Sequence, residues 1–111
     1  MDADVRRLKA ALELRGVTGL QVEVRFESED GTVAYGDLFD EATMTLVEVD
    51  GFVTHAQRAV FRKDRKRDRW MRKQHAVTTL RVDVLEIRED LDGLADELVG
   101  LLLPPGGRAV A

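Results

Sequence analysis

The stretch that decides the fold reads MTLVEVDG over residues 44–51. It is rich in β-branched residues and ends at a glycine, which predicts a strand over residues 44–50. Because successive side chains of a strand point to opposite faces, Glu48 and Asp50 share one face, while Val47 and Val49 occupy the other. Clustered carboxylates repel one another and favour a divalent cation or a shared proton. This strand is therefore the first candidate for a functional site.

The segments on either side of this strand predict alternating helices and strands. The order α-β-β-β-α-β-α predicts an α/β (α+β) domain with a single mixed sheet, because the crossover helix makes the last strand parallel to the third. Asp30-Gly31 is a hairpin signal between the first two strands. In the first strand, Leu20, Val22, Val24 and Phe26 should face one way. The predicted elements are a helix over 3–15, strands over 20–26, 32–39 and 44–50, a helix over 56–74, a strand over 77–82 and a helix over 90–103.

The 111 residues are enough for one domain with its own core. We expect this domain to span residues 1–103, and residues 104–111, which begin with two prolines and two glycines, to form a flexible tail. The chain has no cysteine and no apolar run of the roughly 20 residues that span a bilayer. The N-terminus also lacks an apolar signal core. We therefore expect a cytoplasmic protein with no disulfide and no membrane partner.

Charge is segregated along the chain, although the net charge is only −4. Residues 58–73 carry nine basic residues against Asp64 and Asp68, a local excess of +7, so the remainder sums to −11. A helix this basic suits a phosphate backbone. The alternative is a solvated face with local ion pairs. The candidate DNA-binding residues are Arg58, Arg62, Arg65, Lys66, Arg69 and Lys73.

A wider set of residues around the central strand resembles a known nuclease family. Asp37 stands in the preceding strand, 11 residues before Glu48, and His55 follows in the loop after Asp50. With the downstream pattern, these residues are similar to the PD-(D/E)xK nuclease-like superfamily, and most similar to its very-short-patch-repair-like branch (domain of unknown function 559). The downstream residues of the match are Phe61, Asp64, Arg65, Arg67, Asp68, Met71, Leu80, Arg81 and Val82.

The resemblance implies a restriction-endonuclease-like core with a metal site. By position, Asp37 and Glu48 would bind Mg²⁺ or Mn²⁺, and Asp50 would join them where many members of the superfamily have a catalytic lysine. His55 would be the next group to contact water, metal or phosphate, and it completes the catalytic set. An all-oxygen pocket suits such a hard cation. The chain departs from the family before the fourth strand, where His75-Ala76 stands in place of a glycine–aromatic pair.

The resulting hypothesis is a metal-dependent endonuclease-like domain that hydrolyses DNA phosphodiester bonds. The alternative is a catalytically inactive nucleic-acid- or protein-binding module on the same fold. A third reading is an interaction protein whose basic helix meets an acidic partner. We expect specificity to come from loops, a homodimer or a partner protein. Three residues also have structural readings: Arg67 would bridge to the acidic pocket, His75 would end its helix, and Glu13 would be exposed rather than near the metal.

Overall fold

The computed structural model describes residues 2–51 and 58–103, apart from the side chains of residues 58–61. Its centre is one four-stranded mixed sheet in the order β1-β2-β3-β4. The first three strands are antiparallel neighbours, and β4 runs parallel to β3. The predicted fold class, an α+β domain built on a single mixed sheet, is confirmed. The elements are α1 (Ala3–Leu14), β1 (Gln21–Glu27), β2 (Val33–Asp40), β3 (Thr45–Asp50), α2 (Arg58–His75), β4 (Thr78–Asp83), α3 (Val84–Glu89) and α4 (Leu91–Leu102).

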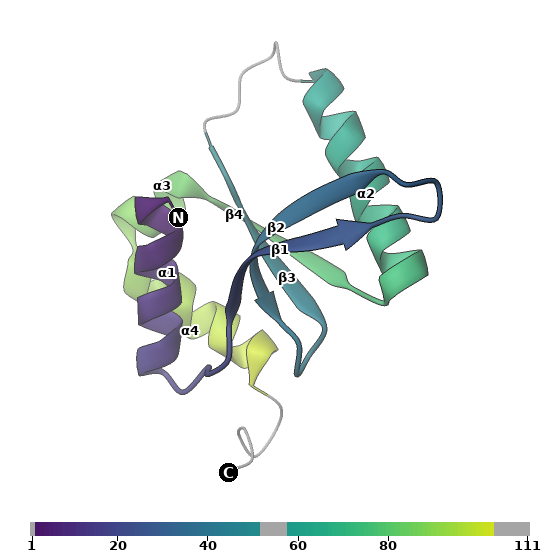
Figure 1. Cartoon of the computed structure of the whole chain (residues 1–111). Helices are drawn as coiled ribbons and strands as arrows, with labels where there is room; N and C mark the ends of the chain where they lie inside the picture. The colour runs from purple at the N-terminus through teal and green to yellow at the C-terminus, as the bar shows by residue number, and fades with distance from the viewer. Residues whose placement is uncertain (1, 52–57, 104–111) are drawn as a thin grey trace.

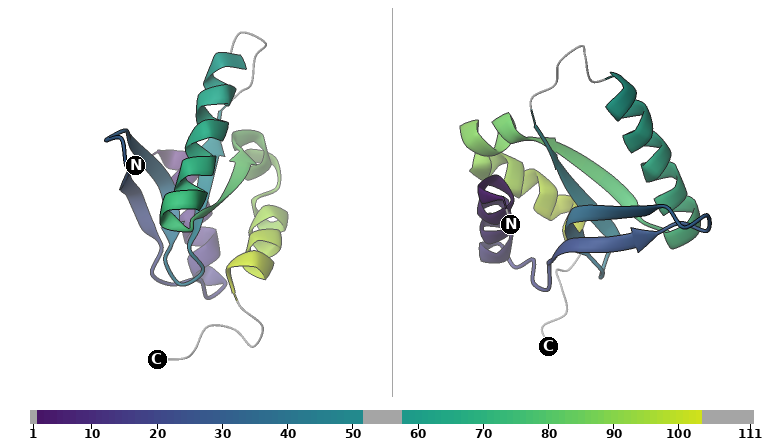
Figure 2. Two further views of the ribbon diagram at one scale, coloured as in Figure 1. Left: turned by 90° about the vertical axis from the view of Figure 1, so that its right-hand side faces the viewer. Right: turned by 45° about the horizontal axis from the view of Figure 1, so that its top comes forward.

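Helices cover both faces of the sheet (Figure 1 and Figure 2). α1, α3 and α4 lie together on one side, and α2, which links β3 to β4, lies on the other. The sequence pattern did not predict α3. This helix is six residues long, too short for a hydrophobic period to show, and the side chain of Asp83 caps it by accepting a hydrogen bond from the N–H of Leu85.

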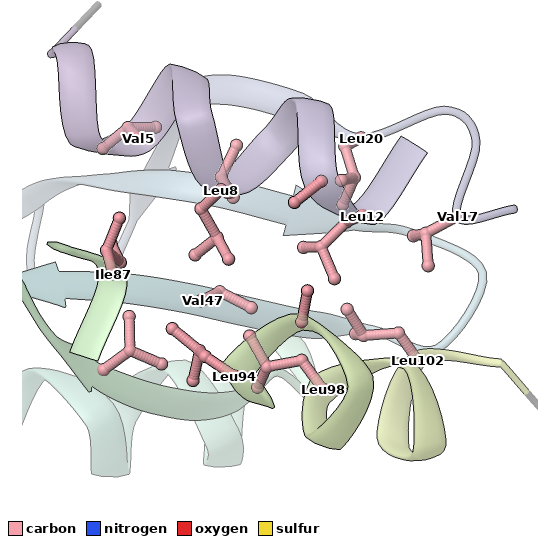
Figure 3. Close-up of a cluster of buried hydrophobic side chains, with 14 residues drawn as sticks. Val5, Leu8, Leu12, Val17, Leu20, Val47, Ile87, Leu94, Leu98 and Leu102 are labelled. Carbon is pink, nitrogen blue, oxygen red and sulfur yellow. The ribbon is translucent and has the colours of Figure 1, made fainter. Parts of the chain in front are cut away.

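The larger hydrophobic core lies between the sheet and the three helices on its first side (Figure 3). Leu8 and Leu12 of α1 pack there against Val47 of β3 and Leu98 of α4. Their spacing of four residues places both leucines on the same face of α1. Full burial of one such leucine contributes about 1.5–3 kcal/mol. This core holds β3 in place and so fixes the position of the polar side chains on the strand's other face.

A smaller core lies under α2 on the second side of the sheet. Leu46 of β3 and Met71 of α2 are both fully buried in it. Phe26 and Phe39 close it with an edge-to-face contact whose ring centroids are 5.4 Å apart. Because Leu46 faces this core and Val47 the larger one, the predicted alternation of β3 is confirmed.

The first strand departs from the predicted alternation. Leu20 packs in the larger core, whereas Val24 and Phe26 belong to the smaller one, so the prediction that these residues face one way is wrong. Between them lies Glu23, whose φ of 51° is in the left-handed region and interrupts the regular alternation of a strand. The ladder pairs Val22 with Leu38 and Val24 with Gly36 on either side of this residue.

Some predictions fall outside the described residues. These are the tail over residues 104–111, the loop that contains His55 and the side chain of Arg58. Among the helices that the structure describes, none combines the length and the apolar composition needed to cross a membrane.

Candidate functional site

Asp37 of β2 and Glu48 of β3 form a pair of carboxylates on adjacent strands. The backbone N–H of Asp37 donates a hydrogen bond to Oε1 of Glu48 at 3.3 Å. The backbone N–H of Val49 donates to Oδ2 of Asp37 at 2.8 Å. Each carboxylate is therefore oriented by the backbone of the strand that carries the other. The sequence predicted that these two acids would meet, and the structure brings them together.

Glu48 is a buried carboxyl group, with only 7% of its surface exposed. Burial, with a smaller contribution from the negative charge of Asp37, raises its pKa to about 7, while Arg67 opposes both effects. The Arg67 guanidinium lies 3.4 Å from Oε2 of Glu48, so the prediction that Arg67 bridges to the acidic pocket is confirmed. Near neutral pH, the protonated and ionised forms of the Glu48 carboxyl therefore differ little in free energy.

Asp50 is held by a different arginine. Nη1 of Arg81, on β4, donates to Oδ1 of Asp50 at 3.0 Å. The same guanidinium makes a two-pronged contact with Asp68 of α2 (3.1 and 2.9 Å) and lies 3.7 Å from Asp64. Burial raises the pKa of Asp50, and Arg81 counteracts this effect. Asp50 thus shares the α2 side of the sheet with Glu48, but its charge is balanced by Arg81.

The three predicted metal ligands are not equally suited to hold an ion. Within residues 2–51 and 58–103, no three Asp, Glu or His side chains are arranged to coordinate a metal. Asp37 and Glu48 fit a hard cation by their chemistry, because their oxygens are close enough for the charge of Asp37 to raise the Glu48 pKa. Asp50 is instead paired with Arg81 through its Oδ1. His55, the remaining predicted catalytic residue, lies outside the described residues.

Asp37 also borders a cavity of about 360 Å³ that sequence analysis did not anticipate. Its wall includes Asp4 in the first turn of α1 and Arg88 of α3, which pair at 2.9 Å. Arg88 holds the pKa of Asp4 below its ordinary value. Asp4 was not among the predicted site residues and α3 was not predicted, so no sequence signal joined these residues. Glu13, the first-helix acid considered earlier, is exposed and pairs with Lys9.

The basic helix α2 has two distinct faces. Asp64, Arg67, Asp68 and Met71 are three or four residues apart and face the sheet, as their contacts with β3 and β4 show. The outer face is cationic and exposed. Within the described part of the chain, no salt bridge joins these outer cations to an acid. They are Arg62, Lys63, Arg65, Lys66, Arg69, Arg72 and Lys73.

No protein-family model, no curated protein and no solved structure matches this chain.

Proposed function

We propose that this chain is a PD-(D/E)xK-like nuclease domain that hydrolyses DNA phosphodiester bonds with Mg²⁺ or Mn²⁺. The observation that carries the proposal is the pair Asp37 and Glu48, two carboxylates on adjacent strands with one of them buried. The sheet of three antiparallel strands followed by a helix and a parallel strand supports it, because the resemblance implies that order.

The residues of the site have separate roles in this proposal. Asp37 and Glu48 would hold the cation, which when bound supplies a Lewis acid and a more acidic water. The backbone N–H groups of Asp37 and Val49 keep the two carboxylates oriented. Arg67, at 3.4 Å from Glu48, is a cation that would contact a phosphate oxygen once the metal balances the Glu48 charge. His55 is the predicted proton donor to the leaving oxygen.

The outer face of α2 would hold the DNA strand. Its lysines and arginines are exposed, and such cations bind phosphates by releasing counterions. Arg67 on the sheet-facing side of α2 contacts Glu48, and the exposed cations lie on the same helix, so the helix would connect binding with chemistry. The predicted contacts are Arg58, Arg62, Arg65, Lys66, Arg69 and Lys73.

A second candidate is a binding module on the same fold that has no catalytic activity. The observation in its favour is that Arg67 and Arg81 already neutralise Glu48 and Asp50. A site whose charges are balanced by the chain itself needs no metal for stability. This reading predicts DNA binding that depends on salt but not on Mg²⁺ or Mn²⁺, with no turnover.

Cleavage of supercoiled plasmid with Mg²⁺ or Mn²⁺ tests the proposal. Asp37→Asn and Glu48→Gln keep an oxygen for each backbone N–H, so both variants should fold and neither should nick the plasmid. Glu13→Gln, an exposed acid on α1, is the matched control and should cleave like the unmodified chain. Equal cleavage by all four proteins would refute the assignment of the site. No cleavage by any, with DNA binding intact, would favour the second candidate.

A further inference from the structure

A second cavity, of about 440 Å³, lies between α2 and the turn that joins β1 to β2. Lys66, Arg69 and Lys73 contribute cations from one wall, and Trp70 contributes an aromatic ring. Ser28, Glu29 and Asp30 form the other wall with hydroxyl and carboxylate oxygens. The size of this cavity is within the range of small-ligand sites. Among the residues that the structure describes, the two cavities share no lining residue with each other.

The walls of this cavity are held together by contacts between the hairpin and the end of α2. The backbone N–H of Glu29 donates to Oε1 of Gln74 at 2.8 Å. Nε2 of His75, the last residue of α2, lies 2.8 Å from the carbonyl oxygen of Glu27. The Trp70 ring meets His75 edge to face, with centroids 5.8 Å apart. Figure 1 shows the hairpin reaching across to α2. The site is therefore built before any ligand arrives.

The turn itself is also ordered. Asp30 accepts hydrogen bonds from the hydroxyl of Ser28 and from the backbone N–H of Thr32, the latter at 3.0 Å. These bonds, with the nearby charge of Lys66, lower the pKa of Asp30 to about 2. A fixed anion thus faces the cations of α2 across the cavity.

This combination of groups matches the parts of a nucleotide. Lysine and arginine bind phosphate oxygens, and an aromatic face stacks on a base of any sequence. Carboxylate and hydroxyl oxygens accept hydrogen bonds from the amino groups of a base. In a duplex the base faces are stacked on their neighbours, so only an unpaired nucleotide can place its base beside Trp70. Cations alone would bind any polyanion, but the aromatic ring and the acceptors select for a base.

We infer that the cavity between α2 and the β1–β2 turn binds one unpaired nucleotide of a single-stranded or frayed DNA segment. The inference rests on the DNA-binding part of the proposed function and narrows its substrate class. Lys66, Arg69 and Lys73 hold the phosphates, Trp70 receives the base, and the turn contacts the base edge. The nucleotide enters on the outer side of α2.

The fluorescence of Trp70 tests this inference, because it is the only tryptophan in the chain. The full chain would be titrated in EDTA with an oligodeoxynucleotide of about eight nucleotides. Saturable quenching is expected, and an abasic strand of the same length should bind about tenfold more weakly because it has no base to stack on Trp70. A blunt duplex and inorganic polyphosphate can contact the cations of α2 but offer no unpaired base, so each should quench much less than the oligodeoxynucleotide does.

Two double charge reversals test whether binding depends on this cavity or only on the overall charge of the chain. Lys66→Glu with Arg69→Glu should abolish quenching, whereas Arg6→Glu with Arg7→Glu, the same change of charge at two exposed arginines on α1, should not. Trp70→Phe keeps a ring in place and should weaken binding of a labelled strand, measured by anisotropy, by less than the double reversal on α2 does. Equal binding of the abasic and normal strands, or quenching by polyphosphate as strong as that by the normal strand, would overturn the inference.

The fluorescence titration tests nucleotide binding independently of nuclease activity, because it contains no metal. Plasmid cleavage without quenching by single strands would leave the proposed function standing and refute the nucleotide site. Quenching without cleavage would support the nucleotide site on a chain that binds DNA without cutting it.

Discussion

Replacing Glu48 by Gln should change how the stability of the chain depends on pH. Glu48 has an ordinary pKa of 4.5 and a pKa of about 7 in the folded, metal-free chain. A carboxyl group whose pKa is raised by folding favours the folded state while it is protonated. Its contribution is fully present below pH 4.5 and is lost as the pH rises through about 7. The amide that replaces the carboxyl group in Glu48→Gln does not titrate, so the variant lacks this loss.

The size of the effect follows from the difference between the two pKa values. At about 1.4 kcal/mol for each pH unit, the Glu48 contribution falls by about 3 kcal/mol between about pH 4 and about pH 8. The amide oxygen of Gln still accepts from the Asp37 N–H, and the loss of the Arg67 pair partly offsets the gain at high pH. Any part of the cost of losing the Arg67 pair that does not vary with pH shifts the free energy of unfolding of Glu48→Gln by the same amount at every pH. It therefore does not alter the change between about pH 4 and about pH 8.

Urea denaturation in EDTA at several pH values measures this effect. The free energy of unfolding of Glu48→Gln, relative to the unmodified chain, should rise by about 3 kcal/mol from about pH 4 to about pH 8. Parallel pH profiles for the two proteins would show that burial does not raise the pKa of Glu48, and the reasoning about this carboxyl group would be refuted.

Three further predictions concern other contacts. In urea denaturation, Arg81→Leu should lower the free energy of unfolding by about 2–3 kcal/mol, because it leaves Asp50, Asp64 and Asp68 without their shared guanidinium. Arg81→Lys should recover only part of that free energy, because an ammonium group cannot make the two-pronged contact. Gly36→Ala should lower the free energy of unfolding by about 1–3 kcal/mol, because the new Cβ would lie 2.1 Å from Cδ1 of Leu46. Gly100→Ala in α4, with open space around it, should raise the free energy of unfolding by about 0.5–1 kcal/mol. An unchanged thermal midpoint for Gly36→Ala would contradict the close packing of Gly36 against Leu46. Arg69→Ala with Lys73→Ala should reduce the slope of log K against log salt for single-stranded DNA by about 1.4, and an unchanged slope would place the phosphates elsewhere.

The central strand shows how much the sequence predicts. Alternation over residues 44–50 places Leu46 and Glu48 on one face of the strand and Val47 on the other. The structure has this arrangement, with Leu46 and Glu48 toward α2 and Val47 in the larger core. These predictions succeed because they depend on local periodicity, which the backbone geometry fixes.

The rest of the site depends on contacts between distant parts of the chain. Glu23 is neither glycine nor proline, yet it adopts a left-handed conformation that interrupts the alternation of β1. Arg81 gathers acids from β3 and α2, and Arg88 meets Asp4 from the opposite end of the chain. A single sequence shows which residues are charged, but it does not show which opposite charges meet.

Titration calorimetry with Mn²⁺ tests most directly whether Asp37 and Glu48 form a cation-binding site. Near pH 6, Glu48 is mostly protonated in the folded chain because burial raises its pKa to about 7, so a bound ion should displace about one proton. Saturable binding is expected, with a heat that depends on the ionisation enthalpy of the buffer, and this binding should be lost in Glu48→Gln. No binding at millimolar Mn²⁺, or the same binding and proton release in Glu48→Gln, would contradict the assignment of this site.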